Sequence, residues 1–271
     1  MRWAIAALVL IAAGAIAAPW LADAMGQDPF GADLLGRYQP PSAAHPLGTD
    51  ELGRDLLLRL LYGARVSLSV GIAAALAASL VGTTIGIACA MLGGIVDATL
   101  MRLADGLIAL PSLPLLVVLA AVDPAKLGLP RDIPAFDLAR IVAIIALFGW
   151  VSLARLSRAV ALSLLRRDFV LAASALGASP MRIALRHLAP NLLAPVATAA
   201  TLSVGGTILT ESVLSFLGLG IQPPTASWGN MLANAQEMVF AAPLLAVWPG
   251  AAIFITVIAC NVIGDRLQRR G

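Results

Sequence analysis

The sequence predicts an all-α polytopic membrane protein with six transmembrane helices and both termini in the cytoplasm. Its 271 residues are 60% hydrophobic and only 12% charged, whereas a soluble domain carries about 25% charged residues. The mean hydropathy is +0.92. Apolar runs such as residues 69–92 do not alternate in polarity as barrel strands do. Their many small residues are typical of closely packed transmembrane helices.

Six segments are near or above the roughly 20 residues that cross a bilayer. The first follows Arg2 and resembles a signal peptide with Ala-Ile-Ala at 15–17, so cleavage is one interpretation. An uncleaved signal anchor is preferred because it leaves an even number of spans. Pro111 and Pro114 interrupt the third span and Pro195 the fifth, and kinks are expected there. The six segments are residues 3–21, 66–92, 103–122, 138–156, 192–217 and 244–263.

Arginine placement orients these spans, because cytoplasmic segments carry an excess of Lys and Arg. With the N-terminus inside, 11 of the 18 basic residues fall on the inner side, six of them between Arg155 and Arg186. That inner loop holds Asp168 as its only acid, whereas the outer basic residues are mixed with ten acids. The bias predicts cytoplasmic termini and a cytoplasmic loop in the middle of the chain.

The sequence also limits the chemistry of the chain. A Walker phosphate-binding loop needs a Lys after Gly, but the single lysine, Lys126, follows Ala125. Cys89 and Cys260 lie in apolar runs, and no zinc spacing, disulfide framework or Ser–His–acid set is visible. We therefore expect a non-enzyme with no catalytic residues, no metal and no nucleic-acid partner. Any ATP that drives it is expected on another subunit.

Residues 171–191, LAASALGASPMRIALRHLAPN, are polar and basic in an otherwise apolar chain. Gly177 suits a left-handed helix C-cap, Ser179 an N-cap, and Pro180 the first helical position. The pattern predicts two short helices, the second ending at Pro190.

The second short helix is amphipathic by its spacing. Arg182 and Arg186 share one of its faces. Such a helix can lie on lipid headgroups or insert into a groove on a partner protein, and the residues alone leave both open. Its predicted apolar face consists of Met181, Ala184, Leu185 and Leu188.

The same stretch resembles the EAA loop of ABC-importer permeases. Leu171 replaces the usual Glu, and His187 stands where isoleucine is usual. The resemblance implies a coupling loop at about residues 158–190 whose helix fits a cleft on a cytoplasmic ATPase. The positions that match the motif are Ala172, Ala173, Gly177 and Pro190. The residues that it assigns to ATPase coupling are Ala172, Ala173, Gly177, Ser179, Pro180, Met181, Arg182, Leu185 and Arg186.

Longer stretches narrow this resemblance to the peptide/nickel family of ABC importers, C-type subunit. They are residues 45–71, 93–111, 215–232 and 248–267. The resemblance implies the type I ABC-importer permease fold. The domains expected are an N-terminal helix with an outer loop (1–62), the permease domain (63–267) and a cytoplasmic tail (268–271).

This resemblance also implies partners and a location. Expected are a homologous permease as heterodimer partner, two ATPase subunits carrying ATP and Mg, an extracytoplasmic binding protein, and membrane lipid. The location is the bacterial plasma (inner) membrane. The substrates expected are dipeptides or oligopeptides, with nickel or metal chelates as the alternative. A secondary carrier and a membrane scaffold are the alternatives from other classes.

A few further side chains are candidates outside the loop. Glu211 and Asp105 are candidates for the substrate pathway, with a structural hydrogen bond for Glu211 and an interfacial ion pair between Asp105 and Arg102 as the alternatives. The motif GTTIG at 82–86 fits close helix packing. Trp228 also suits an anchor at the membrane interface. Candidates for contacts of the outer loop with partners are His45, Asp50, Arg54, Asp55 and Trp228.

Overall fold

The computed structural model describes residues 1–123 and 134–269, whose regular elements are helices. Five helices are long and apolar enough to cross a membrane, and a bent helix pair makes a sixth candidate span when its two halves are counted as one, so the structure has five or six candidate spans where the sequence predicts six. The bent pair is α3 (Gly94–Ala109) and α4 (Ser112–Ala121). The five long helices are α1 (Arg2–Met25), α2 (Leu56–Leu92), α5 (Pro134–Leu165), α8 (Ala189–Phe216) and α10 (Leu244–Gln268).

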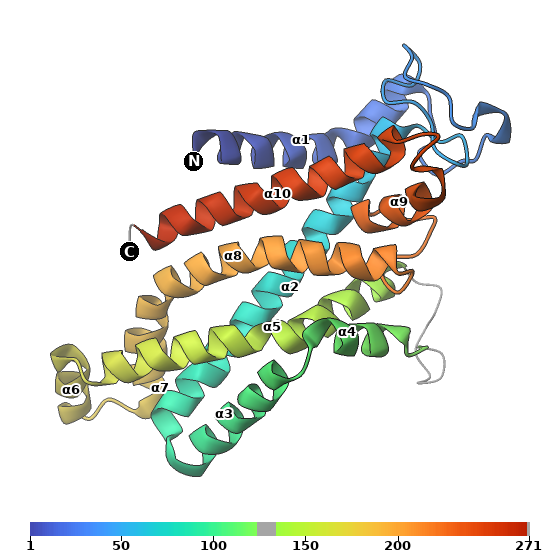
Figure 1. Cartoon of the computed structure of the whole chain (residues 1–271). Helices are drawn as coiled ribbons and strands as arrows, with labels where there is room; N and C mark the ends of the chain where they lie inside the picture. Colours follow the sequence, from blue (N-terminus) through green and yellow to red (C-terminus); the bar gives the residue numbers. More distant parts are fainter. Residues whose placement is uncertain (124–133, 270–271) are drawn as a thin grey trace.

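The long helices lie side by side, with α2 crossing the row obliquely and touching α1, α5, α8 and α10 (Figure 1). Both termini lie at the same end of the bundle as the short helix α6 (Asp168–Ala175). The outer loop before α2 and the short helix α9 (Trp228–Ala235) lie at the opposite end. This arrangement agrees with the orientation predicted from the arginines.

The first helix packs through small side chains. Ala4, Ala15, Ala18 and Ala22 are its buried residues, and it contacts α2 and α10. Alanine faces let helix backbones approach closely, so α1 is an integrated part of the bundle. Its retention as an uncleaved anchor stays a prediction, which this packing supports.

Helix α2 begins ten residues before the span predicted at 66–92. The Asp55 side chain caps it by accepting a hydrogen bond from the Leu58 amide at 2.8 Å. Arg59, in the added N-terminal part of the helix, is buried, and its Nε lies 3.2 Å from Asp50 Oδ2. The domain boundary expected at 62/63 therefore falls inside a continuous helix.

The glycines of the motif GTTIG lie where α2 and α5 approach each other closely. A methyl group at Gly82 would meet the Trp150 carbonyl oxygen at 2.6 Å, and one at Gly86 would meet the Ala154 carbonyl oxygen at 2.6 Å. Both distances are shorter than any ordinary contact of a β-carbon. Only glycine fits at these two positions, so the motif holds α2 against α5.

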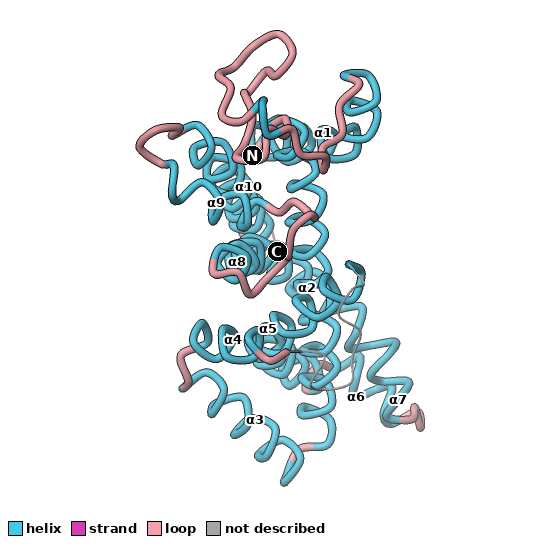
Figure 2. Tube along the Cα trace, turned by 90° about the vertical axis from the view of Figure 1, so that its right-hand side faces the viewer, coloured by secondary structure: helices cyan, strands magenta, loops and turns pink. Residues whose placement is uncertain are grey.

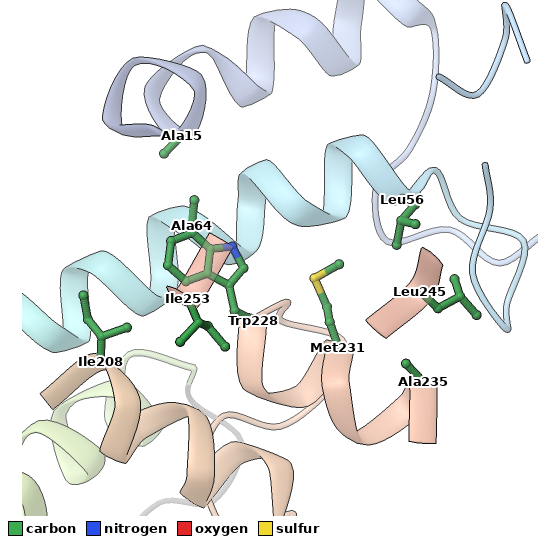
Figure 3. Close-up of a cluster of buried hydrophobic side chains, with 9 residues drawn as sticks. All are labelled: Ala15, Leu56, Ala64, Ile208, Trp228, Met231, Ala235, Leu245 and Ile253. Atoms are coloured by element: carbon green, nitrogen blue, oxygen red, sulfur yellow. The ribbon is translucent and has the colours of Figure 1, made fainter. Parts of the chain in front are cut away.

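A cluster of apolar side chains near the outer end joins α1, α2, α8, α9 and α10 (Figure 3). Trp228 is 1% exposed, and its indole Nε1 donates a hydrogen bond to the Leu60 carbonyl at 3.1 Å. The expectation that Trp228 anchors the membrane interface is wrong, because its ring is enclosed by protein. The cluster consists of Ala15, Leu56, Ala64, Ile208, Trp228, Met231, Ala235, Leu245 and Ile253.

The third span is broken, where the sequence predicted a kink. Helices α3 and α4 meet at 90° around Pro111, and Figure 2 shows them at the edge of the array beside α5. Pro195, in contrast, lies inside the continuous helix α8. The break follows from the closely spaced Pro111 and Pro114, since each proline removes a backbone donor and fixes φ.

Candidate functional site

The candidate site is the cytoplasmic loop between α5 and α8, here called the coupling loop. Its first helix is α6 (Asp168–Ala175), which ends before Gly177 at φ +85°. The amides of Gly177 and Ala178 donate hydrogen bonds to the carbonyls of Ser174 (2.9 Å) and Ala173 (3.0 Å). The left-handed cap predicted at Gly177 is therefore confirmed, and it turns the chain away from α6.

The second helix of the loop, α7 (Pro180–Ile183), begins as its sequence predicts. The Ser179 hydroxyl accepts a hydrogen bond from the Arg182 amide at 3.3 Å, and Pro180 occupies the first turn. The expected end at Pro190 is wrong. The chain continues through the π-helix η3 (Ala184–Leu188) into α8, giving one continuous span from Pro180 to Phe216. Pro190 lies in the first turn of α8, directly after the wider π-helical turn.

The helical register of this segment differs from the predicted one. Leu188 is 0% exposed and Ile183 is buried, and both pack with Val170 in the core beneath the loop. The residues predicted to form one apolar face therefore lie on different sides of the helix, because the π-turn rotates Leu188 toward the core. Met181 and Leu185 remain on the surface.

The coupling loop leaves an apolar surface uncovered at the cytoplasmic end. Leu176 is 90% exposed, Met181 68% and Leu185 66%. Arg182 and Arg186 are exposed beside them. Ala172 is exposed and Ala173 half-buried in α6. Large exposed apolar patches are typical of interaction sites, so this surface is a candidate contact site.

The other predicted residues do not join this surface. Glu211 is 0% exposed in α8, where its carboxylate accepts hydrogen bonds from Ser215 Oγ at 2.7 Å and Ser67 Oγ at 3.0 Å. Ser67 Oγ in turn accepts the Trp228 amide at 3.2 Å, and Ser215 Oγ accepts the Ile221 amide at 3.0 Å. The carboxylate therefore ties α2, α8 and the loop before α9 together.

Asp105 is paired, but with a different arginine than expected. It forms an ion pair with Arg155 of α5, and one turn nearer the cytoplasm Arg158 pairs with Asp97. Arg102 is not the partner. Sequence reasoning missed the α3–α5 pairs, although opposite charges in two otherwise apolar segments were a usable signal.

The outer loop is held together by its own charges. Arg54 Nε lies 2.7 Å from Asp50 Oδ2, and His45 Nδ1 lies 3.1 Å from Asp55 Oδ2. Asp50, Arg54 and Asp55 are buried in this chain, so their side chains shape the loop instead of facing outward. His45, which is partly exposed, is the one of these four still placed to reach a partner.

The surface of the coupling loop presents mainly apolar and basic side chains. In residues 1–123 and 134–269, no group of three or more His, Cys, Asp or Glu side chains could hold a metal ion. The chemistry of the loop is therefore that of an apolar and basic contact surface.

Comparison with known proteins identifies the family of this chain. Residues 82–270 match the family described as "Binding-protein-dependent transport system inner membrane component". The chain belongs to this family. It is a multi-pass inner-membrane permease subunit of an ABC importer, and it is neither an enzyme nor a carrier of a cofactor.

The chain is also similar to permeases of the peptide/nickel group along nearly its whole length. It is 38% identical to the nickel transport system permease protein NikC of Escherichia coli K12 over 268 residues, which is 99% of this chain and 92% of that protein. It is 37% identical to the oligopeptide transport system permease protein OppC of Bacillus subtilis over 236 residues, 87% of this chain and 74% of the relative.

A third relative is named for another substrate. It is the glutathione transport system permease protein GsiD of Escherichia coli O6:K15:H31, 37% identical over 261 residues, 96% of this chain and 82% of the relative. These three related permeases thus differ in the solutes that their names give.

Proposed function

We propose that this permease forms half of the translocation pathway for dipeptides or oligopeptides, together with a second, homologous permease. A binding protein outside the membrane delivers the solute, and two ATPase subunits dock on the cytoplasmic side. Nickel or metal chelates are the alternative substrates. Peptide and peptide-like solutes in the names of related permeases support the peptide assignment.

The observation that carries this proposal is the exposed surface of the coupling loop. An apolar patch flanked by arginines at the cytoplasmic end suits a groove with an apolar floor and an acidic rim. Leu176, Met181 and Leu185 would fill the floor, and Arg182 and Arg186 would meet the rim. Ala172 and Ala173 would line α6 on the same side.

The helix geometry supplies a route for coupling. The segment from Pro180 to Phe216 is one span, so a displacement of the docking surface moves the whole of α8. Glu211 links the far end of α8 to α2 and to the outer loop before α9. Closure of the ATPases on ATP would thereby switch the pathway between outward-open and inward-open states. It can do so because the closed ATPases bind the two states of the permease with different affinities.

Two variants test the docking role in proteoliposomes containing the full importer. R186E reverses a charge on the proposed rim, and R269E makes the same change at the exposed C-terminal end of α10. We expect R186E to lose transport and the ATPase stimulation by loaded binding protein, while R269E retains both. Full transport by R186E would refute the docking role of Arg186.

A second pair of measurements addresses the apolar floor and the substrate. L176A removes a side chain that is 90% exposed, so the fold should not suffer while ATPase co-purification weakens. The solute bound to the co-purified binding protein is then identified by mass spectrometry. Recovery of peptides supports the assignment, and recovery of nickel or a chelate replaces it by the alternative.

A further inference from the structure

The break between α3 and α4 is the most unusual feature of the membrane-spanning part. Helix α3 ends at Ala109, α4 begins at Ser112, and the two helices are bent by 90°. Neither the coupling loop nor the outer loop touches this element in a way that would explain it. The role of the break must therefore lie in the contacts of α3 and α4 themselves.

Packing against α5 shows the depth of the break in the membrane. Ala104, before the break, clusters with Trp150, Val151 and Ala154 of α5. Leu116 and Ala120, after the break, cluster with residues near the start of α5, Ile141 and Ile145. The break thus lies beside residues 145–150 of a span that runs from Phe136 to Leu165. This position is near the middle of the crossing.

The break leaves backbone groups without partners at this depth. The last four carbonyls of a helix, here residues 106–109, have no partner within the helix. Within the described part of the chain they accept no hydrogen bond from elsewhere, and the Ser112 hydroxyl has no partner either. Most of the segment 105–114 is exposed in this chain. The broken turn is therefore an uncovered set of polar groups.

Lipid cannot cover such a set. Hydrocarbon offers no hydrogen bonds, so irregular backbone at membrane depth occurs only where it is enclosed by protein or lines a water-filled cavity. The set is rich in acceptors, because Pro111 and Pro114 supply no N–H donors of their own. The C-terminal end of α3 also carries the negative end of the helix dipole, which favours a cationic group. Broken helices of this kind form solute sites in several transporter folds.

We propose that the α3–α4 break lines the aqueous pathway of the permease. There the carbonyls of residues 106–109 and the Ser112 hydroxyl accept hydrogen bonds from N–H or ammonium groups of the solute. The proposal rests on the peptide assignment above for the identity of those donors. It concerns this chain's own backbone.

Cysteine accessibility tests the proposal in the assembled importer. S112C is placed in a C89A/C260A background, which removes the two native thiols. V118C, on the exposed side of α4 two turns away, is the matched control. A charged, membrane-impermeant thiol reagent is applied to proteoliposomes, because only a thiol in water ionises and reacts. Transport by both unlabelled variants is measured first.

We expect S112C to react roughly tenfold or more faster than V118C. Labelling of S112C should also block transport, and an excess of dipeptide delivered by the binding protein should slow the labelling. Equal and slow labelling at both positions would overturn the proposal, since the break would then face lipid or the partner permease.

The substrate question gives a separate readout. In one possible outcome, S112C is labelled rapidly, and nickel slows the labelling whereas dipeptides do not. This outcome would overturn the proposal that the break binds N–H or ammonium groups of the solute. That outcome would also refute the peptide proposal, whereas slow labelling of S112C with peptide transport intact would refute only the role of the break. The two failures are therefore distinguishable.

Discussion

The α2–α5 crossing allows the sharpest test of the structure, through the change G86A. The added methyl group would lie 2.6 Å from the Ala154 carbonyl oxygen and 2.7 Å from the Ser157 β-carbon. Ordinary contacts of a β-carbon begin near 3.4 Å, so α5 would have to retreat by about 0.8 Å. Neither neighbour is the end of a flexible side chain, so the helix itself must move.

Overpacking of this kind costs about 1–3 kcal/mol. In a chain of this size each kcal/mol lowers the melting temperature by roughly 2–4 °C. We therefore expect G86A to melt several degrees below the parent protein in detergent. Because α5 leads directly into the coupling loop, ATPase stimulation by the binding protein should fall as well.

The control is G206A, the same change in the interior of α8. Nothing lies within 4 Å of a methyl group at Gly206, so alanine there gains helix propensity without a clash. G206A should melt at or above the parent temperature. If G86A and G206A melt alike, the close approach of α2 and α5 described above is incorrect.

Two further changes separate structural from functional roles. G177A adds a side chain at a residue whose φ is +85° and where nothing lies within 4 Å of the new methyl group. It therefore costs about 1–2 kcal/mol of local backbone strain, and transport coupling should fall. The control is G26A, at φ +63° on the outer side, which carries the same strain and should leave ATPase stimulation unchanged. E211Q replaces an acceptor of the Ser67 and Ser215 hydroxyls, so the free energy of unfolding should drop by about 1–3 kcal/mol while transport per folded molecule persists. Loss of transport at unchanged thermal stability would instead place Glu211 in the pathway.

Local features of the coupling loop could be predicted because their causes lie within a few residues. The cap at Gly177, the N-cap at Ser179 and the first-turn position of Pro180 depend on backbone geometry and on short-range hydrogen bonds. The register after Ile183 could not be predicted in the same way. After the π-turn, Leu188 packs with residues of α5 and α6, which lie earlier in the chain and which no local pattern reveals.

The prolines and glycines show the same limit. Pro111 lies at a 90° break, whereas Pro195 lies inside a continuous helix, although both prolines occur within apolar stretches of the sequence. Gly86 meets α5 at contact distance, whereas Gly206 meets nothing. The difference lies in the neighbouring helices and not in the residues themselves.

The class of the protein, its candidate membrane spans and the capped turns of the coupling loop could be predicted from the sequence alone. These follow from hydrophobic length and short-range capping, which act along the chain. Only the tertiary structure decided that Trp228 and Glu211 are enclosed, that Asp105 pairs with Arg155, and that the third span is broken. Each of these depends on contacts between helices distant in sequence, because burial and hydrogen-bond partners come from whichever segment packs alongside.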